Sequence, residues 1–147
     1  MQKIKTKLNK GYQDPLFLRS MDLKVEMLKK DKAVLSMACN EHTLSGYGSL
    51  YGGIIGFAAD IAIWNALLTR GDEPHVVTTD LNTHFLERFG KGRARFEATI
   101  LRYGARMIMG ECKVYNAKNN LAAHVTASFL RVDSTKRQKA SKLEKNA

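Results

Sequence analysis

The sequence predicts an α+β fold in which an antiparallel sheet of about six strands wraps around one long central helix. Residues 52–69 carry one charged side chain, Asp60, so this helix is apolar nearly all round and must be buried. Six other segments alternate apolar and polar residues, and the short turns between most of them favour antiparallel neighbours. A single helix can cover a broad sheet only if the sheet curls around it.

The first two strands form a predicted hairpin. Residues 21–28 alternate apolar and charged side chains, residues 29–32 make a polar turn, and residues 33–39 alternate again. A loop with Ser45, Gly46 and Gly48 then leads to the helix, which Gly71 and Pro74 end.

Four further strands are predicted over residues 75–86, 93–102, 106–115 and 121–132. In the first of them, strict alternation places Val77, Leu81 and Phe85 on one face. The opposite face then carries Thr78, Asp80, Asn82 and His84. Adjacent Thr78 and Thr79 should therefore face opposite sides, so that at most one of them reaches a site beside the helix.

The chain of 147 residues, 44% of them hydrophobic, is long enough for one domain with a real core. The formal net charge of +10 is concentrated at the ends, with four lysines in residues 1–12 and five basic against two acidic residues in 133–147. We therefore divide the chain into a basic N-terminal extension (1–20), one domain (21–132) and a basic flexible tail (133–147).

Composition also argues against several classes of function. The body of the chain has no basic face with interleaved aromatic residues, which argues against nucleic-acid binding, and no apolar run long enough for membrane insertion. Cys39 and Cys112 are far apart and have no metal-ligand spacing, so we expect reduced, buried cysteines, no metal site and a cytoplasmic location.

The helix start combines two groups that suit acyl chemistry. Gly52 and Gly53 open the helix, where free N–H groups and the positive end of the dipole can receive an oxygen. Asp60 is costly to bury in so apolar a helix unless it is used or paired. Asp60 can act as a base or nucleophile, or be a structural acid bonded to a neighbour; the glycines can form an oxyanion site or only a tight turn.

These residues resemble a motif of the hotdog-fold acyl-CoA thioesterases, in the superfamily of 4-hydroxybenzoyl-CoA thioesterase and its PaaI-like branch. Gly48, Gly52, Gly53 and Asp60 stand at the places of the motif N-x-x-G-x-x-H-G-G and of the acid that follows it. Residues 77–86 resemble the next strand of that branch, and residues 103–106 its x-G-x-R turn. Tyr51 replaces the usual histidine, and Ser45 stands where the branch has asparagine.

The resemblance implies an acyl-CoA thioesterase and gives each candidate residue a role. Asp60 is the general base or nucleophile, and the N–H of Gly53 is the oxyanion donor. The other implied catalytic residues are Ser45 and Thr78, the latter placing water, and the implied substrate-binding residues are Tyr51, Gly52, Thr79, Phe57 and Trp64. Two alternatives remain open: the threonines reflect ordinary strand propensity, and the aromatic residues only pack in the core.

Four basic residues near turns could together bind the phosphates of coenzyme A, or be solvated charges: Arg88, Lys91, Arg102 and Arg106. The resemblance further implies a homodimer or homotetramer with the site between subunits, the Asp60 helix from one chain and the Thr78 strand from the other. It implies no cofactor beyond the coenzyme A of the substrate.

Two rival functions stay open beside hydrolysis. A non-hydrolytic hotdog protein that binds an acyl-CoA or acyl-carrier group is favoured by Tyr51 and Ser45. A binder of nucleic acids or membrane surfaces would depend on the two basic ends.

Overall fold

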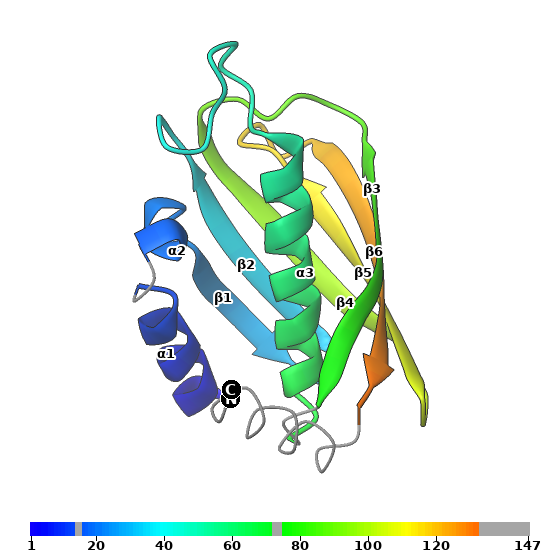
Figure 1. Ribbon diagram of the computed structural model, residues 1–147. Coiled ribbons are helices and arrows are strands. Elements are labelled where there is room, and N and C mark those ends of the chain that lie inside the picture. Colours follow the sequence, from blue (N-terminus) through cyan, green and yellow to red (C-terminus); the bar gives the residue numbers. More distant parts are fainter. Residues whose placement is uncertain (14–15, 72–74, 133–147) are drawn as a thin grey trace, which may run out of the picture.

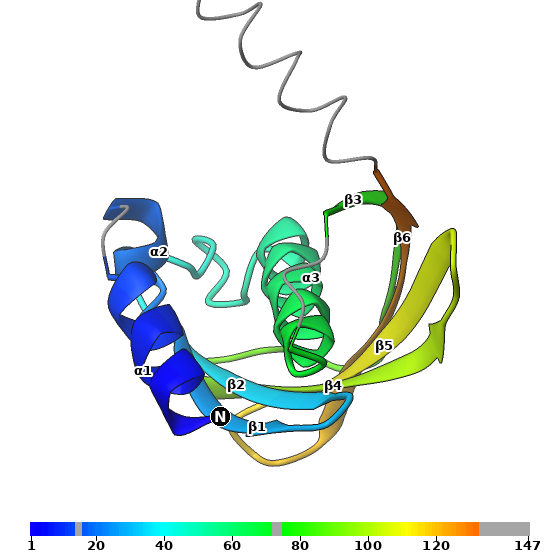
Figure 2. The ribbon, with the colours of Figure 1, turned by 90° about the horizontal axis from the view of Figure 1, so that it is seen from below.

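The computed structural model describes residues 1–13, 16–71 and 75–132. Within them, an antiparallel sheet curls around one long helix, as Figures 1 and 2 show. The helices are α1 (Gln2–Gly11), α2 (Leu16–Ser20) and α3 (Gly52–Leu68). The strands are β1 (Lys24–Lys29), β2 (Lys32–Cys39), β3 (Val76–Phe85), β4 (Gly92–Tyr103), β5 (Met107–Tyr115) and β6 (Leu121–Arg131). The predicted fold class is confirmed; the predicted tail, residues 133–147, lies outside the described residues.

Helix α3 is buried because the sheet surrounds it on one side. Small side chains on its inner face, among them Ala58, Ala62 and Ala66, are fully buried and let the backbone approach the strands. The closest approach is at Gly110 of β5, where a Cβ would lie 2.4 Å from Cγ2 of Ile63. Only glycine fits this contact without displacing the helix.

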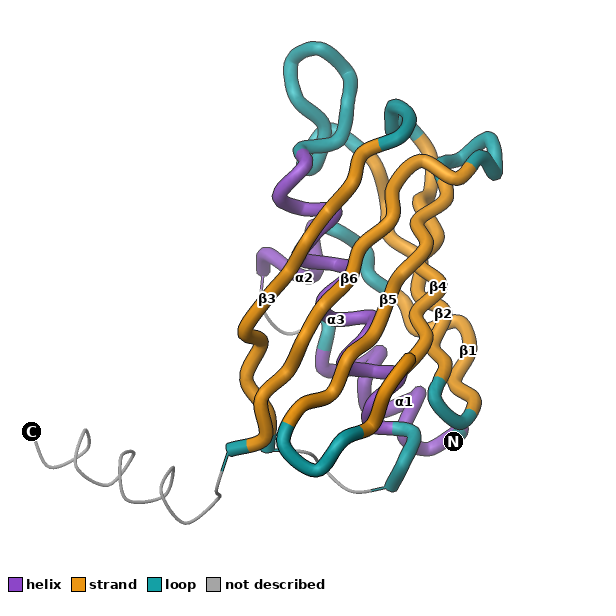
Figure 3. Tube along the Cα trace, turned by 90° about the vertical axis from the view of Figure 1, so that its right-hand side faces the viewer, coloured by secondary structure: helices purple, strands orange, loops and turns teal. Residues whose placement is uncertain are grey.

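The sheet has the strand order β1-β2-β4-β5-β6-β3, and every neighbouring pair is antiparallel. Helix α3 therefore carries the chain from β2, near one edge of the sheet, to β3, at the other edge. Figure 3 shows β3 as the outermost strand, beside β6. Strand β3 thus passes alongside α3 with one of its backbone edges unpaired in the sheet.

The hairpin of β1 and β2 forms as predicted, but β1 begins later than expected. Met21 and Leu23 precede the strand and are still fully buried. A bulge between Val25 and Met27 then shifts the register, so Met27 is 40% exposed although strict alternation predicts it on the inner face. The predicted strand over 21–28 is wrong at its start and at Met27.

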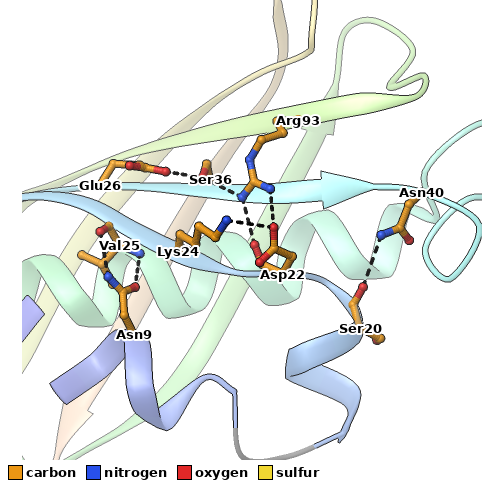
Figure 4. A network of polar contacts seen from close by, with 9 residues as sticks. All are labelled: Asn9, Ser20, Asp22, Lys24, Val25, Glu26, Ser36, Asn40 and Arg93. Carbon is orange, nitrogen blue, oxygen red and sulfur yellow. Dashed lines mark hydrogen bonds and ion pairs between the residues drawn. The ribbon is translucent and has the colours of Figure 1, made fainter. Parts of the chain in front are cut away.

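Residues 1–20 form two helices that the sequence analysis does not predict. The side-chain amide of Asn9 in α1 accepts from the N–H of Val25 at 2.6 Å and donates to its carbonyl at 3.2 Å, which ties α1 to β1 (Figure 4). A signal was present, because Ile4, Leu8 and Tyr12 recur every four residues between lysines, as on one face of a helix.

A partly exposed ion pair between Arg93 and Asp22 holds the chain between α2 and β1. The Arg93 guanidinium donates to Oδ2 of Asp22 at 2.6 Å and to the Asp22 carbonyl at 2.9 Å, and it also donates to Oγ of Ser36 (Figure 4). Asp22 has φ 44°, a left-handed backbone conformation that these contacts hold in place. The N-terminal helices are therefore connected to the sheet through a defined turn.

Candidate active site

The start of α3 leaves two backbone donors free. Tyr51 is the N-cap residue and makes no side-chain capping bond. Among the described residues, the N–H groups of Gly52 and Gly53 have no hydrogen-bond acceptor. A Cβ at Gly52 would lie 2.9 Å from the Phe85 ring, whereas one at Gly53 would meet no atom within 4 Å. Gly52 therefore lets β3 pack close, and the N–H end of the helix at Gly53 is open to an incoming oxygen.

Asp60 lies on the same side of α3 as Gly53. Seven residues turn a helix to within about 20° of two full turns and advance it about 10 Å. The side chain of Asp60 leans back toward the helix start, as Cβ atoms of helices do, which shortens the gap to the free N–H groups.

The carboxylate of Asp60 is half-buried and has one side-chain partner. Oγ1 of Thr78 donates a hydrogen bond of 3.0 Å to Oδ1 of Asp60. Burial among apolar groups raises the pKa of Asp60 above its ordinary value, and the Thr78 hydrogen bond opposes part of this rise. The acid is thus held ready to accept a proton, as a general base requires.

A β-bulge turns Thr78 toward the helix. The register of β3 on β6 shifts between Thr78 and Asp80, so Thr79 is the extra residue and Thr78 lies opposite Phe129, whose side chain points into the core. The hydroxyl of Thr79 donates to the Ser128 carbonyl instead.

The bulge corrects one expectation about Thr78. Strict alternation puts Thr78 on the face opposite Leu81, but both lie on the α3 side, because the extra residue resets the two-residue repeat. Thr78 reaches Asp60 within one chain, and a site shared between two subunits stays a prediction. One part of the prediction is confirmed: only one of the two threonines reaches Asp60.

The predicted aromatic residues lie along the uncovered face of α3. Phe57 and Trp64, seven residues apart, share the face of Gly53 and Asp60. Phe57 packs edge-on against Phe17 of α2, with the ring centroids 5.4 Å apart. Trp64 lines an apolar cavity of about 600 Å³ between α3 and the N-terminal helices. These two side chains are partly exposed, unlike the alanines on the inner face.

Tyr51 and Ser45 lie before the helix start. The Tyr51 side chain is 55% exposed and stands at the N-cap. Ser45 belongs to a tight turn in which its N–H donates to the Ser49 carbonyl and its carbonyl accepts from Gly48. Its hydroxyl has no hydrogen-bond partner within the described part of the chain. The structure thus places Ser45 in the loop that leads to α3 but joins it to no other candidate residue.

The four predicted basic residues do not share one mouth within a single chain. Arg88 and Lys91 lie between β3 and β4, at the end of the sheet where α3 begins. Arg102 and Arg106 lie at the turn between β4 and β5, at the opposite end (Figure 1). The expectation that all four gather at one opening is wrong for one chain, because antiparallel strands carry successive turns to opposite ends.

A polar cleft of about 410 Å³ lies beside Arg88 and Lys91. The guanidinium of Arg88 also donates to the Tyr47 carbonyl, which fixes it to the loop before α3. Sequence reasoning missed the other polar residues of this cleft: Glu87, which follows β3, and Asn116, Lys118 and Asn120 from the turn between β5 and β6. Nδ2 of Asn120 donates to the Glu87 carboxylate at 3.1 Å. In the sequence, this run of asparagines around a lysine predicts only a polar turn.

The described residues contain no group of three or more metal-ligating side chains. Among their helices, none has the length and apolar character to cross a membrane. The cysteines predicted to be buried, Cys39 and Cys112, are buried and free, and burial raises the pKa of both thiols.

Comparison with known proteins assigns the chain to a family. The model of the thioesterase superfamily matches residues 47–123. A protein of Saccharolobus solfataricus described as a "putative esterase" is 35% identical over 116 residues, 79% of this chain and 82% of that protein. A second protein of the same organism and description is 26% identical over 108 residues, 74% of this chain and 72% of that protein.

Solved structures agree with the fold. A mutant of the phenylacetic acid degradation protein PaaI from Thermus thermophilus has a TM-score of 0.71 at 24% identity, over 80% of this chain and 100% of that one. A thioesterase from Haemophilus influenzae has a TM-score of 0.79 at 18% identity, over 88% and 90%. With its sheet curled around α3, and with the matched segment spanning the helix start, Asp60 and Thr78, this chain belongs to the thioesterase superfamily and has the hotdog fold that it shares with PaaI.

Proposed function

We propose that this chain hydrolyses an acyl-CoA thioester to the free acid and coenzyme A. The observation that carries the proposal is the pairing of a half-buried carboxylate with unbonded N–H groups on one face of α3. The thioester oxygen would accept a hydrogen bond from the N–H of Gly53. This N–H would stabilise the negative charge that builds on the oxygen as the tetrahedral intermediate forms. Asp60 would either take a proton from the attacking water or attack the carbonyl carbon itself. In the second case the carbon–sulfur bond would break, coenzyme A would leave as a thiolate, and water would hydrolyse the resulting Asp60 anhydride to the free acid and the carboxylate.

Thr78 supports both versions of this step. Its hydroxyl donates to the carboxylate, which orients Asp60 and keeps one oxygen free for the reaction. In the base version, the water oxygen forms a bond to the carbonyl carbon while its proton goes to Asp60. The same proton then goes to the sulfur as the carbon–sulfur bond breaks, so coenzyme A leaves as a thiol.

Coenzyme A carries phosphates that need basic partners. The cleft with Arg88, Lys91 and Lys118 lies at the same end of the sheet as the start of α3, which supports it as the phosphate site. Arg102 and Arg106 lie too far along the sheet to join that cleft in one chain. If the β3 edges of two subunits pair antiparallel, the second subunit would bring the end of its sheet that carries the turn between β4 and β5 toward this cleft.

A homodimer paired through β3 is the assembly that we propose, with a homotetramer of two such dimers as the alternative. Ten residues of β3 form a sheet edge with exposed Val77 and Leu81, and unpaired edges of this length favour pairing with another strand. Light scattering should give twice the chain mass of 16.5 kDa, or four times for the tetramer. A monomer mass would contradict the assembly.

Hydrolysis is tested with a panel of acyl-CoA substrates and detection of free thiol. Asp60→Asn should lower kcat by at least about 100-fold, because loss of a general base removes this order of rate enhancement. Asp80→Asn is the matched control: Asp80 is an exposed carboxylate on the neighbouring strand, and its partner is Asn82. Equal activity of Asp60→Asn and wild type would contradict the proposal.

Binding without hydrolysis is the second candidate function. Ser45, whose hydroxyl has no partner among the described residues, and the exposed Tyr51 favour it, since both differ from the PaaI-like motif. Calorimetry with intact acyl-CoA distinguishes the two: saturable binding with no thiol release from any substrate of the panel would establish the second function and exclude the first.

A further inference from the structure

The N-terminal helices and α3 together line an apolar cavity that is open to solvent on one side. Helix α2 touches α3 where Phe17 meets Phe57, and the end of α1 touches it where Nδ2 of Asn65 donates to the Tyr12 hydroxyl at 2.6 Å. Between these contacts lies a cavity of about 600 Å³. Its lining residues come from α1, α2 and the second half of α3: Ile4, Lys7, Leu8, Gly11, Tyr12, Leu18, Trp64, Leu68 and Gly71.

The cavity continues the face of α3 that carries the candidate acid. Trp64 is four residues after Asp60 and Leu68 four residues after Trp64, so the three side chains follow one line along the helix. From Asp60 to Leu68 the helix advances about 12 Å. A group attached to a carbonyl carbon beside Asp60, and extending away from the helix start, would enter the cavity past Trp64.

The size of the cavity and its mostly apolar lining favour a long apolar group over a small one. An engineered apolar cavity of about 150 Å³ accommodates benzene, and this cavity is roughly four times larger. Its charged residue, Lys7, is exposed, so the ammonium group can stay in water while its stem contacts an apolar ligand.

From this continuity, and building on the proposed function, we infer that the cavity between α1, α2 and α3 binds the acyl chain of the substrate, and that the substrates are thioesters of long, apolar fatty acids. The acyl carbonyl lies at Asp60, the coenzyme A part extends toward the start of α3, and the hydrocarbon chain passes Trp64 toward Leu8 and Leu68.

The first experiment measures kcat/KM for CoA esters from butyryl to dodecanoyl. Each methylene that enters the cavity should raise kcat/KM about fourfold, so dodecanoyl-CoA should exceed butyryl-CoA by at least about 100-fold. A flat or falling series would overturn the inference and leave the hydrolase proposal intact. Absence of hydrolysis for every ester would contradict the hydrolase proposal, and the binding experiment below then decides the inference.

A filling variant localises the effect. Gly11 lines the cavity and a Cβ there meets no atom within 4 Å, so Gly11→Phe adds bulk at the cavity wall. The ratio of kcat/KM for dodecanoyl-CoA to that for butyryl-CoA should fall at least about tenfold. Thr6→Phe places the same ring on the exposed side of α1 and should leave the ratio unchanged. If Gly11→Phe fails to fold, Ile4→Phe has the same expected result; an unchanged ratio in a folded filling variant overturns the inference.

The binding experiment uses the single tryptophan of the chain. Titration with 12-bromododecanoic acid should quench Trp64 fluorescence in a saturable way, because the bromine atom would lie within the cavity. Bromoacetic acid at the same concentration should not quench it, and Gly11→Phe should abolish quenching by the long acid. No quenching in the wild type would overturn the inference. This outcome includes the case in which a second copy of the chain fills the cavity and so keeps the acid out.

Discussion

The hydrogen bond from Thr78 to Asp60 gives the sharpest test of the site. Thr78→Val keeps the shape of the side chain and removes its donor. A hydrogen bond to a charged group contributes about 1.5–3 kcal/mol, and water access at the half-buried carboxylate reduces this to about 1 kcal/mol. That energy favours the ionised over the protonated acid about fivefold. Its loss should raise the pKa of Asp60 further, since burial alone then acts on it.

The assay is kcat/KM of the best acyl-CoA against pH, from about pH 4 to about pH 8, followed by thioester absorbance. A base must be ionised to act, so activity falls as the pH drops through the pKa of Asp60. On this acidic limb, Thr78→Val should be about fivefold less active than wild type, and the difference should narrow as the pH rises.

Two further variants complete this test. Thr78→Ser keeps the donor and should follow the wild-type profile. Thr79→Val is the matched control, because the Thr79 hydroxyl bonds the Ser128 carbonyl and not the acid. An acidic limb that stays in place in Thr78→Val, or that moves equally in Thr79→Val, would refute the assigned role of Thr78.

Three predictions concern stability. Burial raises the folded-state pKa of Asp60, so ionisation of this acid above about pH 4 disfavours folding. Asp60→Asn should therefore raise Tm at neutral pH. The gain in Tm should vanish below the unfolded-state pKa of about 4. Scanning calorimetry at the two pH values checks this, and a lower Tm at neutral pH would contradict it. Gly110→Ala should cost about 1–3 kcal/mol in urea unfolding, because the added Cβ collides with Ile63. Gly53→Ala, which has open space around its Cβ and helical backbone angles, should instead stabilise the fold by about 0.5–1 kcal/mol. Tyr12→Phe should cost about 1–3 kcal/mol, because it takes a hydrogen-bond partner from the fully buried Asn65; a change below about 0.5 kcal/mol would show that water replaces the hydroxyl.

The fold was predictable because its strongest signals are local. The apolar run of α3 and the two-residue repeats of β4, β5 and β6 arise from burial, which selects residue types position by position. The turns that join β1 to β2, β4 to β5 and β5 to β6 connect neighbouring strands, as their length predicts. The connection from β3 to β4 does not: β3 pairs with β6 and β4 with β2, which turn length does not predict. The position of Asp60 on the same face of α3 as Gly53 also follows from spacing alone.

What sequence could not give depends on contacts between distant segments. The bulge at Thr79 results from pairing with β6, and nothing in the threonine pair itself indicates it. The separation of Arg88 from Arg106 depends on which end of the sheet each turn reaches. Helix α1 was readable from Ile4, Leu8 and Tyr12, but its charge pattern also suits a solvated tail, and only docking on β1 decides between the two.

The family match begins at residue 47, after both N-terminal helices. The walls that α1 and α2 give to the proposed acyl pocket thus lie outside the matched segment, whereas Trp64 and Leu68 of the same pocket lie within it. Changes of sequence before residue 20 can remodel one side of the pocket around a hydrocarbon tail without changing Asp60 or Thr78. In this architecture, selectivity can diverge between relatives faster than chemistry does.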